Sequence, residues 1–285
     1  MRQEPAVDWD RFRATMARLE AEVEVECAAL LQLVLPLDRL TGRLVAREAS
    51  PASDRPQDYV ACVLATRSFR LTIASLHLAM SGYPDVGPNL YRTLWEIVVR
   101  LAHIESHPVE GALGYLLQGA DEEASAARAD AADDGPEGDV HVARCEERYA
   151  GHVETARALG LDAEEIRRRH GKLNFRDVCK EHDIEKSYLV NFVWSSGYVH
   201  EKNLATSEFV WSSGEERFFE LGPIRFARAE AMADALGMLI QALGLSASIV
   251  GDESVCSEAS AMIGRLEKRY KLTSTKRSSV MKGPE

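Results

Sequence analysis

The sequence lacks cysteines placed close enough together to form a zinc ribbon or a network of disulfide bonds. Its five cysteines are an odd number and lie far apart, at Cys27, Cys62, Cys145, Cys179 and Cys256. The chain also lacks a glycine-rich loop of the Walker or Rossmann type, which would bind the phosphates of a nucleotide. We therefore predict a cytoplasmic protein that uses no cofactor.

Positive charge is also scarce. The 34 lysines and arginines are outnumbered by 45 aspartates and glutamates, which gives a net charge of -11. Such a chain repels phosphate backbones and anionic membrane surfaces, so tight binding of nucleic acid is not expected. Basic residues gather only at 167–172 and in the C-terminal tail, where we interpret them as a solvated helix end and a solubilising segment.

Long hydrophobic runs are nearly absent. The first ten residues are polar and acidic, unlike a secretory signal peptide. The most apolar stretch, Met232 to Val250, contains Asp234 and Gln241, which would be costly to place in lipid. We predict that this stretch is a buried helix, and no membrane association is expected.

What the sequence does contain is helical periodicity. Apolar residues recur every three or four positions and alternating patterns are scarce, so we predict an all-α, multi-helix bundle. One short β-hairpin at most is expected, near 209–221, where two apolar runs flank a turn-like segment. A first helix begins near Trp9 and is expected to kink or end at Pro36. The later helices are predicted at 37–48, 57–80, 90–106, 109–132, 140–159, 163–170, 175–182, 186–201, 224–250 and 257–270.

Breaker residues suggest a division of the chain into three parts. A cluster of Ser and Pro at 50–56 separates an N-terminal amphipathic helical segment, residues 1–55, from a helical bundle domain, residues 56–270. Residues 271–285 are polar and are expected to form a mobile tail. Inside the bundle, Asp133 to Gly138 is the segment most typical of a loop.

Polar side chains follow one stripe of the predicted helix 90–106. Arg92, Glu96, His103 and His107 are separated by four, seven and four residues, which places them on one side of the helix. Arg92 and Glu96 can pair, and His103 and His107 stand one turn apart, as two metal ligands would. A di-iron bundle would also need Glu-x-x-His pairs on partner helices, and the sequence contains none. We therefore favour an ion pair and two histidines near a helix C-terminus over a metal site.

A second pair, Ser196 and His200, stands one turn apart on the predicted helix 186–201. The pair lacks the strained strand-to-helix turn that holds a nucleophilic serine, and no acid is placed by sequence to orient the histidine. Polar packing within the bundle is the favoured interpretation.

Together these motifs resemble a known family. Gly82-Tyr83, the run from Leu90 to Glu96, Tyr188 and the run from Ser196 to His200 are similar to an uncharacterised bacterial helical family, domain of unknown function five-six-seven-seven. Its pattern is an R-x-x-x-E helix followed by an S-x-x-x-H helix, and the resemblance covers about Tyr59 to Val250. The resemblance implies that Arg92, Glu96, Ser196 and His200 belong to one shared site.

Two other motifs carry less information. An Arg followed a few residues later by a His is typical of HEPN ribonucleases and occurs here three times, as Arg70 with His77, Arg100 with His107 and Arg176 with His182. The composition alone predicts about two such matches by chance. Cys179, Glu181 and His182, with His170 nearby, have the identities of metal ligands, but a structural zinc site normally needs four well-spaced ligands.

The sequence therefore predicts a cytoplasmic helical binding or interaction protein with a polar site in the bundle. The partner is expected to be a small ligand or a protein, and the formation of a homo-oligomer is left open. The alternative is a helical hydrolase or HEPN-like ribonuclease in which His200 acts as general acid or base and Arg92 stabilises negative charge.

Overall fold

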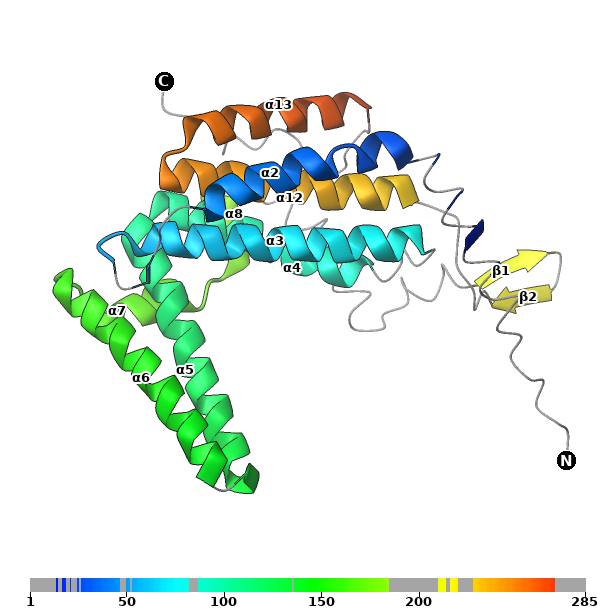
Figure 1. Ribbon diagram of the computed structural model, residues 1–285. Coiled ribbons are helices and arrows are strands. Elements are labelled where there is room, and N and C mark those ends of the chain that lie inside the picture. The colour runs from blue at the N-terminus through cyan, green and yellow to red at the C-terminus, as the bar shows by residue number, and fades with distance from the viewer. Residues whose placement is uncertain are drawn as a thin grey trace, which may run out of the picture.

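Helix α12, Arg228–Val250, is the central helix of the bundle in the computed structural model. It packs against four other helices, which are α2 (Val34–Val45), α3 (Pro56–Met80), α4 (Gly87–Ser106) and α13 (Glu253–Arg269). Figure 1 shows α2, α3, α12 and α13 running alongside one another. The structure describes residues 14, 17, 18, 21, 25, 27–46, 50, 51, 53–81, 87–134, 136–184, 210–213, 216–219 and 228–269. The predicted all-α bundle is confirmed.

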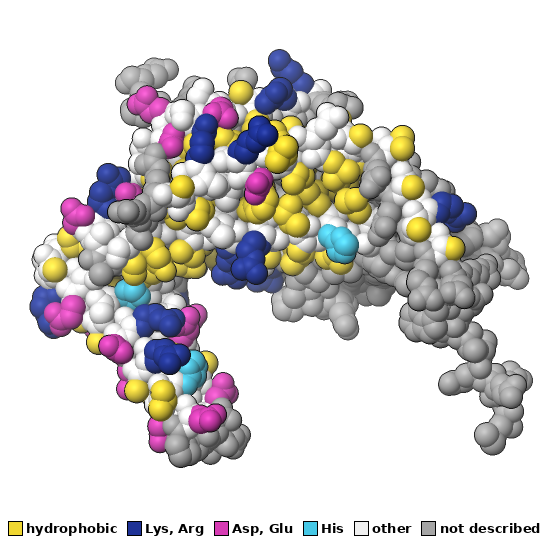
Figure 2. Space-filling view, in the orientation of Figure 1, with side chains coloured by type: hydrophobic (Ala, Val, Ile, Leu, Met, Phe, Trp, Pro, Cys, Tyr) yellow, Lys and Arg dark blue, Asp and Glu magenta, His cyan; other side chains and the backbone are white. Residues whose placement is uncertain are grey.

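The apolarity of α12 is explained by its position in the core. Both α3 and the Ala231–Val250 part of α12 are long and apolar enough to cross a membrane by length and composition alone. In α12, however, 78% of the apolar window is buried inside the bundle, against 44% in α3. The predicted buried helix is therefore found in α12. The outer face of α3 keeps exposed apolar side chains, including Val63 and Ile73, and Figure 2 shows apolar side chains gathered on this side of the bundle.

Helices α5 (Pro108–Asp134) and α6 (Pro136–Ala158) form an arm that projects away from the bundle (Figure 1). Near the bundle, Leu113 and Leu117 of α5 form a buried cluster with Ala156 of α6. Further along the arm the cluster contains only small residues, Ala124, Ala127 and Cys145. Small side chains let two helices approach closely, but they bury little apolar area. The ion pairs Arg128–Glu146 and Arg148–Glu123 also join the two helices along the arm.

The chain returns from the arm to the bundle through three short elements. These are α7 (Ala163–Ile166), a π-helix η2 (Arg167–Gly171) and α8 (Phe175–Glu181). Side-chain caps begin the two α-helices, because Asp162 accepts a hydrogen bond from the Glu165 amide and Asn174 accepts one from the Arg176 amide. Helix η2 packs against α5, and α8 packs against α4.

The predicted hairpin is also present. Strands β1 (Val210–Ser213) and β2 (Glu216–Phe219) pair antiparallel, with Val210 opposite Phe219. The helix predicted at 186–201 lies outside the described residues.

Two details differ from the sequence-based expectation, and both concern proline. The segment Asp133 to Gly138 is not a six-residue loop, because α5 continues to Asp134 and α6 begins at Pro136. Within the described residues 27–46, the helix is interrupted at residues 32–33 and not at Pro36, which lies in the first turn of α2. Proline has no amide hydrogen, but the first turn of a helix does not use that hydrogen, so both prolines are tolerated there.

Candidate functional site

Only two of the four residues of the predicted shared site lie in the part of the chain that the structure describes. Arg92 and Glu96 lie on α4, where the Arg92 Nε donates to Glu96 Oε1 at 3.0 Å. Their side chains are 27% and 29% exposed, so the ion pair lies at the edge of the bundle. Ser196 and His200 lie outside the described residues, and their meeting with Arg92 and Glu96 stays a prediction.

The exposure of the Arg92–Glu96 pair sets an expectation for its contribution to stability. A double-mutant cycle of Arg92→Ala and Glu96→Ala should give a coupling energy below about 1 kcal/mol, because solvent screens a partly exposed pair. Urea denaturation of the four proteins measures this value. A coupling above about 3 kcal/mol would instead indicate a dry pair and would contradict this placement.

Three histidines converge where α4 meets η2. His103 lies in the last turn of α4, and His107 lies between α4 and α5, one turn later. His170 comes from η2. The ring centroids of these histidines form a triangle with sides of 4.8, 5.2 and 5.3 Å. We call His103, His107 and His170 the histidine cluster.

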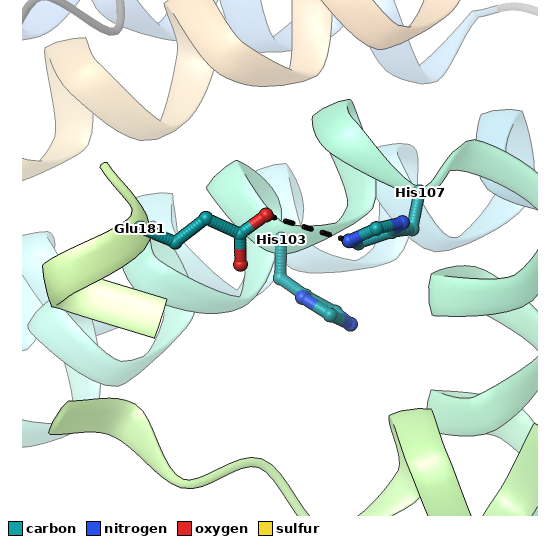
Figure 3. Close-up of side chains that lie close together, drawn as sticks. All are labelled: His103, His107 and Glu181. Carbon is teal, nitrogen blue, oxygen red and sulfur yellow. Dashed lines mark ion pairs between the residues drawn. The ribbon is translucent and has the colours of Figure 1, made fainter. Parts of the chain in front are cut away.

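Glu181, the last residue of α8, adds a carboxylate to this cluster. Its Oε1 lies 3.5 Å from His107 Nε2, and Figure 3 shows Glu181 and His107 facing each other beside His103. One ligand atom from each of His103, His107 and Glu181 lies within 4.8 Å of the other two. Metal bonds of about 2.1 Å place neighbouring ligand atoms roughly 3.4 Å apart in tetrahedral coordination, so small side-chain movements would complete such a site.

The two ring nitrogens of His103 have different surroundings. Its Nε2 lies 3.0 Å from His170 Nδ1, so one ring donates a hydrogen bond to the other. Its Nδ1 is buried and has no hydrogen-bond partner among the described residues. The whole residue is only 6% exposed. A buried polar atom without a partner is unfavourable, and a bound water or ion is one way in which such an atom is satisfied.

Burial and mutual repulsion favour the neutral form of His103 and His170. Burial, and then the neighbouring His107 and His170 rings, lower the pKa of His103 to about 3. Burial is also the main cause that lowers the pKa of His170. Neutral imidazole is the form that binds a metal ion.

Neighbouring helices fix the position of His170 in two ways. Arg100 of α4 donates its two terminal guanidinium N–H groups to the carbonyl oxygens of His170 and Gly171, at 3.0 and 3.1 Å. On the other side, Gly114 of α5 leaves space for η2, because a Cβ at Gly114 would lie 2.5 Å from His170 Cβ. A π-helix is rare and often occurs at functional sites.

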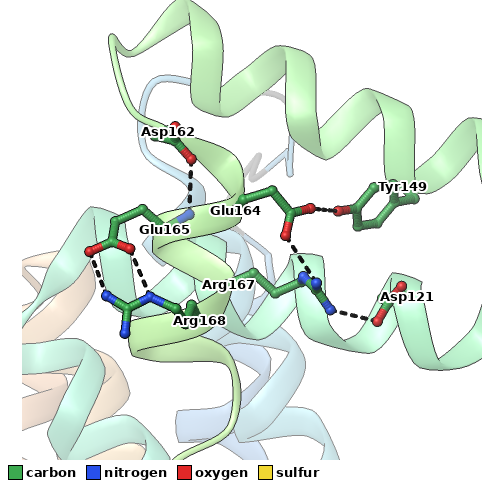
Figure 4. A network of polar contacts seen from close by, with 7 residues as sticks. All are labelled: Asp121, Tyr149, Asp162, Glu164, Glu165, Arg167 and Arg168. Atoms are coloured by element: carbon green, nitrogen blue, oxygen red, sulfur yellow. Dashed lines mark hydrogen bonds and ion pairs between the residues drawn. The ribbon is translucent and has the colours of Figure 1, made fainter.

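A polar network anchors the start of η2 to the arm. Arg167 donates to Asp121 of α5 at 2.7 Å and to Glu164 at 3.0 Å, and Tyr149 of α6 donates to Glu164 at 2.9 Å (Figure 4). Arg168 forms two hydrogen bonds with Glu165. The histidine in η2 is therefore held by α4, α5 and α6 together.

The same network explains the basic run at 167–172. Arg167 pairs with Asp121 and Glu164, while Arg168 and Arg169 both pair with Glu165. These acidic partners neutralise much of the positive charge of the run.

The sequence contained the parts of this cluster but not their arrangement. The spacing of His103 and His107 was visible, and Glu181 and His170 had the identities of ligands. Nothing in the sequence linked them, because His103 and His170 are 67 residues apart. Of the other two residues with ligand identities in this segment, Cys179 is buried in the core. The His182 ring stays close to the cluster, with its Nε2 3.5 Å from Ser106 Oγ, and it contributes to the lowered pKa of His103.

A comparison with known families supports the resemblance to a family of unknown function. A family of unknown function, DUF5677, matches residues 58–217, which is more than half of the chain and includes nearly all of α3 and the whole of α4 to α8. No curated protein and no solved structure matches the chain. The histidine cluster lies wholly inside the matched region, and the chain belongs to the DUF5677 family.

Proposed function

We propose that the chain is a helical binding protein that holds one divalent transition-metal ion with His103, His107 and Glu181. Two observations carry this proposal: His103, His107 and Glu181 converge on one another, and the buried Nδ1 of His103 has no partner among the described residues. Two imidazoles and one carboxylate are a common ligand set for Zn²⁺ and Fe²⁺.

The surroundings of the three side chains support this assignment. His103 is buried, while His107 and Glu181 are half-exposed, so an ion can reach the site from solvent. The negative charge of Glu181 and the net charge of -11 both favour a cation over an anion. We propose a cytoplasmic setting, which agrees with the odd number and wide spacing of the five cysteines.

Calorimetric titration of the tag-free, chelator-treated protein with ZnCl₂ tests the proposal. We expect one Zn²⁺ per chain in the wild type, and an affinity at least about 100-fold lower in His107→Ala and in Glu181→Gln, because a lost ligand should cost more than a lost supporting hydrogen bond. His77→Ala, which removes an exposed histidine of α3, is the matched control and should bind normally.

Titration with MgCl₂ adds a test of the ligand chemistry. Mg²⁺ prefers oxygen ligands and keeps its waters, so it should not compete with Zn²⁺ at this site. A wild type that binds no Zn²⁺, or a His107→Ala protein that binds it as tightly as the wild type, would overturn the proposal.

The alternative, a hydrolase or HEPN-like ribonuclease, has less support among the described residues. His200 lies outside them, and Arg92 is paired with Glu96. Arg100, the arginine of one HEPN-like pair, already binds two backbone carbonyls, and burial lowers its pKa to about 10. We therefore retain metal binding as the proposed function.

A further inference from the structure

We infer that His170 is a positioning residue for this site, because it accepts the Nε2 proton of His103 and so leaves the lone pair on His103 Nδ1 free for the metal ion. This inference rests on the proposed metal site and names the residue that fixes which nitrogen of His103 carries the proton. His170 is not one of the three converging ligands.

The hydrogen bond between the two rings is the first step of the argument. A neutral imidazole carries one proton, on Nδ1 or on Nε2, and only the other nitrogen can bind a metal ion. The His103 Nε2 to His170 Nδ1 distance of 3.0 Å is that of a good hydrogen bond. If His170 accepts, the proton is on His103 Nε2 and Nδ1 has its lone pair.

The opposite direction of this bond is less favourable. If His170 donated, the proton of His103 would be on Nδ1, which is buried and has no acceptor among the described residues. A buried donor without an acceptor loses its hydrogen bonds to water and gains none in return. A metal-binding histidine, in contrast, commonly donates its second N–H to a neighbouring acceptor.

The backbone of His170 is held as this role requires. Arg100 binds the carbonyl oxygens of two consecutive residues, His170 and Gly171, and Gly114 allows η2 to lie directly on α5. These contacts come from two helices, and they fix His170 Nδ1 opposite His103. A side chain held by its neighbours in this way positions a ligand more accurately than one on a free loop.

The experiment compares His170→Ala with His170→Asn in the full-length protein. Asparagine places its Oδ1 near the position of the histidine Nδ1 and keeps an acceptor for His103, whereas alanine removes it. We expect Zn²⁺ affinity to fall about 10- to 100-fold in His170→Ala and to recover to within a few fold of the wild type in His170→Asn. His77→Ala again serves as the control.

A measurement without metal separates this inference from the proposed function. Long-range ¹H–¹⁵N spectra of the metal-free protein report which nitrogen of His103 carries the proton. We expect Nε2–H in the wild type and in His170→Asn, and a mixture of both forms in His170→Ala.

Three outcomes are then distinguishable. Failure of the wild type to bind Zn²⁺, with Nε2–H intact, would overturn the metal site but support the role of His170 in fixing the proton. Normal Zn²⁺ affinity in His170→Ala would overturn the role of His170 and leave the metal site standing. A proton on His103 Nδ1 in the wild type would overturn the inference directly.

Discussion

Replacement of Gly114 with alanine is expected to lower the free energy of unfolding by about 1 to 3 kcal/mol, the usual result of forcing extra volume into a packed contact. The new Cβ would lie 2.5 Å from His170 Cβ and 2.6 Å from the His170 carbonyl carbon. Neither atom is the end of a flexible side chain, so η2 must move away from α5. This movement also displaces His170. We therefore expect the Zn²⁺ affinity to fall by about as much as expected for His170→Ala.

Gly119 in the same helix provides the matched control. Nothing lies within 4 Å of a Cβ built at Gly119, which is exposed on α5. Alanine is the better helix former, so Gly119→Ala should raise the free energy of unfolding by about 0.5 to 1 kcal/mol. Urea denaturation of both variants gives the two values. A stabilising effect of the same size at Gly114 would show that η2 does not pack on α5 as described.

Truncation of Leu236 in α12 is expected to have a still larger effect. Leu236 is fully buried at the centre of the core. Leu236→Ala should therefore lower the free energy of unfolding by about 2 to 5 kcal/mol, through lost apolar burial and the cavity that remains.

The control for this truncation is Leu35→Ala in the first turn of α2, where the side chain is 57% exposed. At this position the same substitution should lower the free energy of unfolding by less than about 1 kcal/mol, because the Leu35 side chain buries little apolar area. Chemical denaturation monitored by circular dichroism measures both. Equal effects at the two positions would contradict the central place of α12.

The helices were largely predictable because each depends on local spacing. The row of apolar residues from Leu90 to Ile104 identified α4, and Pro108 correctly marked its end. The errors arose where one residue type fits two structures. Gly135-Pro136 is typical of a loop, but Pro136 is also well suited to the first turn of α6, and the acidic residues that follow it favour a helix N-terminus.

The candidate site was predictable only in part, and for a related reason. The pairing of Arg92 with Glu96, and the closeness of His103 and His107, follow from their spacing of four residues on helical backbone. The shared site with Ser196 and His200 came from the family resemblance, and those residues lie outside the described part of the chain.

By itself, the sequence determined the all-α class, the buried place of α12 and the pairs that stand one turn apart on α4. A helix repeats every 3.6 residues whatever surrounds it, so these features follow from positions along the chain. Only the tertiary structure decided that Glu181 and His170 meet His103 and His107. That meeting depends on how η2 and α8 pack against α4 and α5, through contacts such as Arg100 with His170 and the space at Gly114, which join residues far apart in the chain.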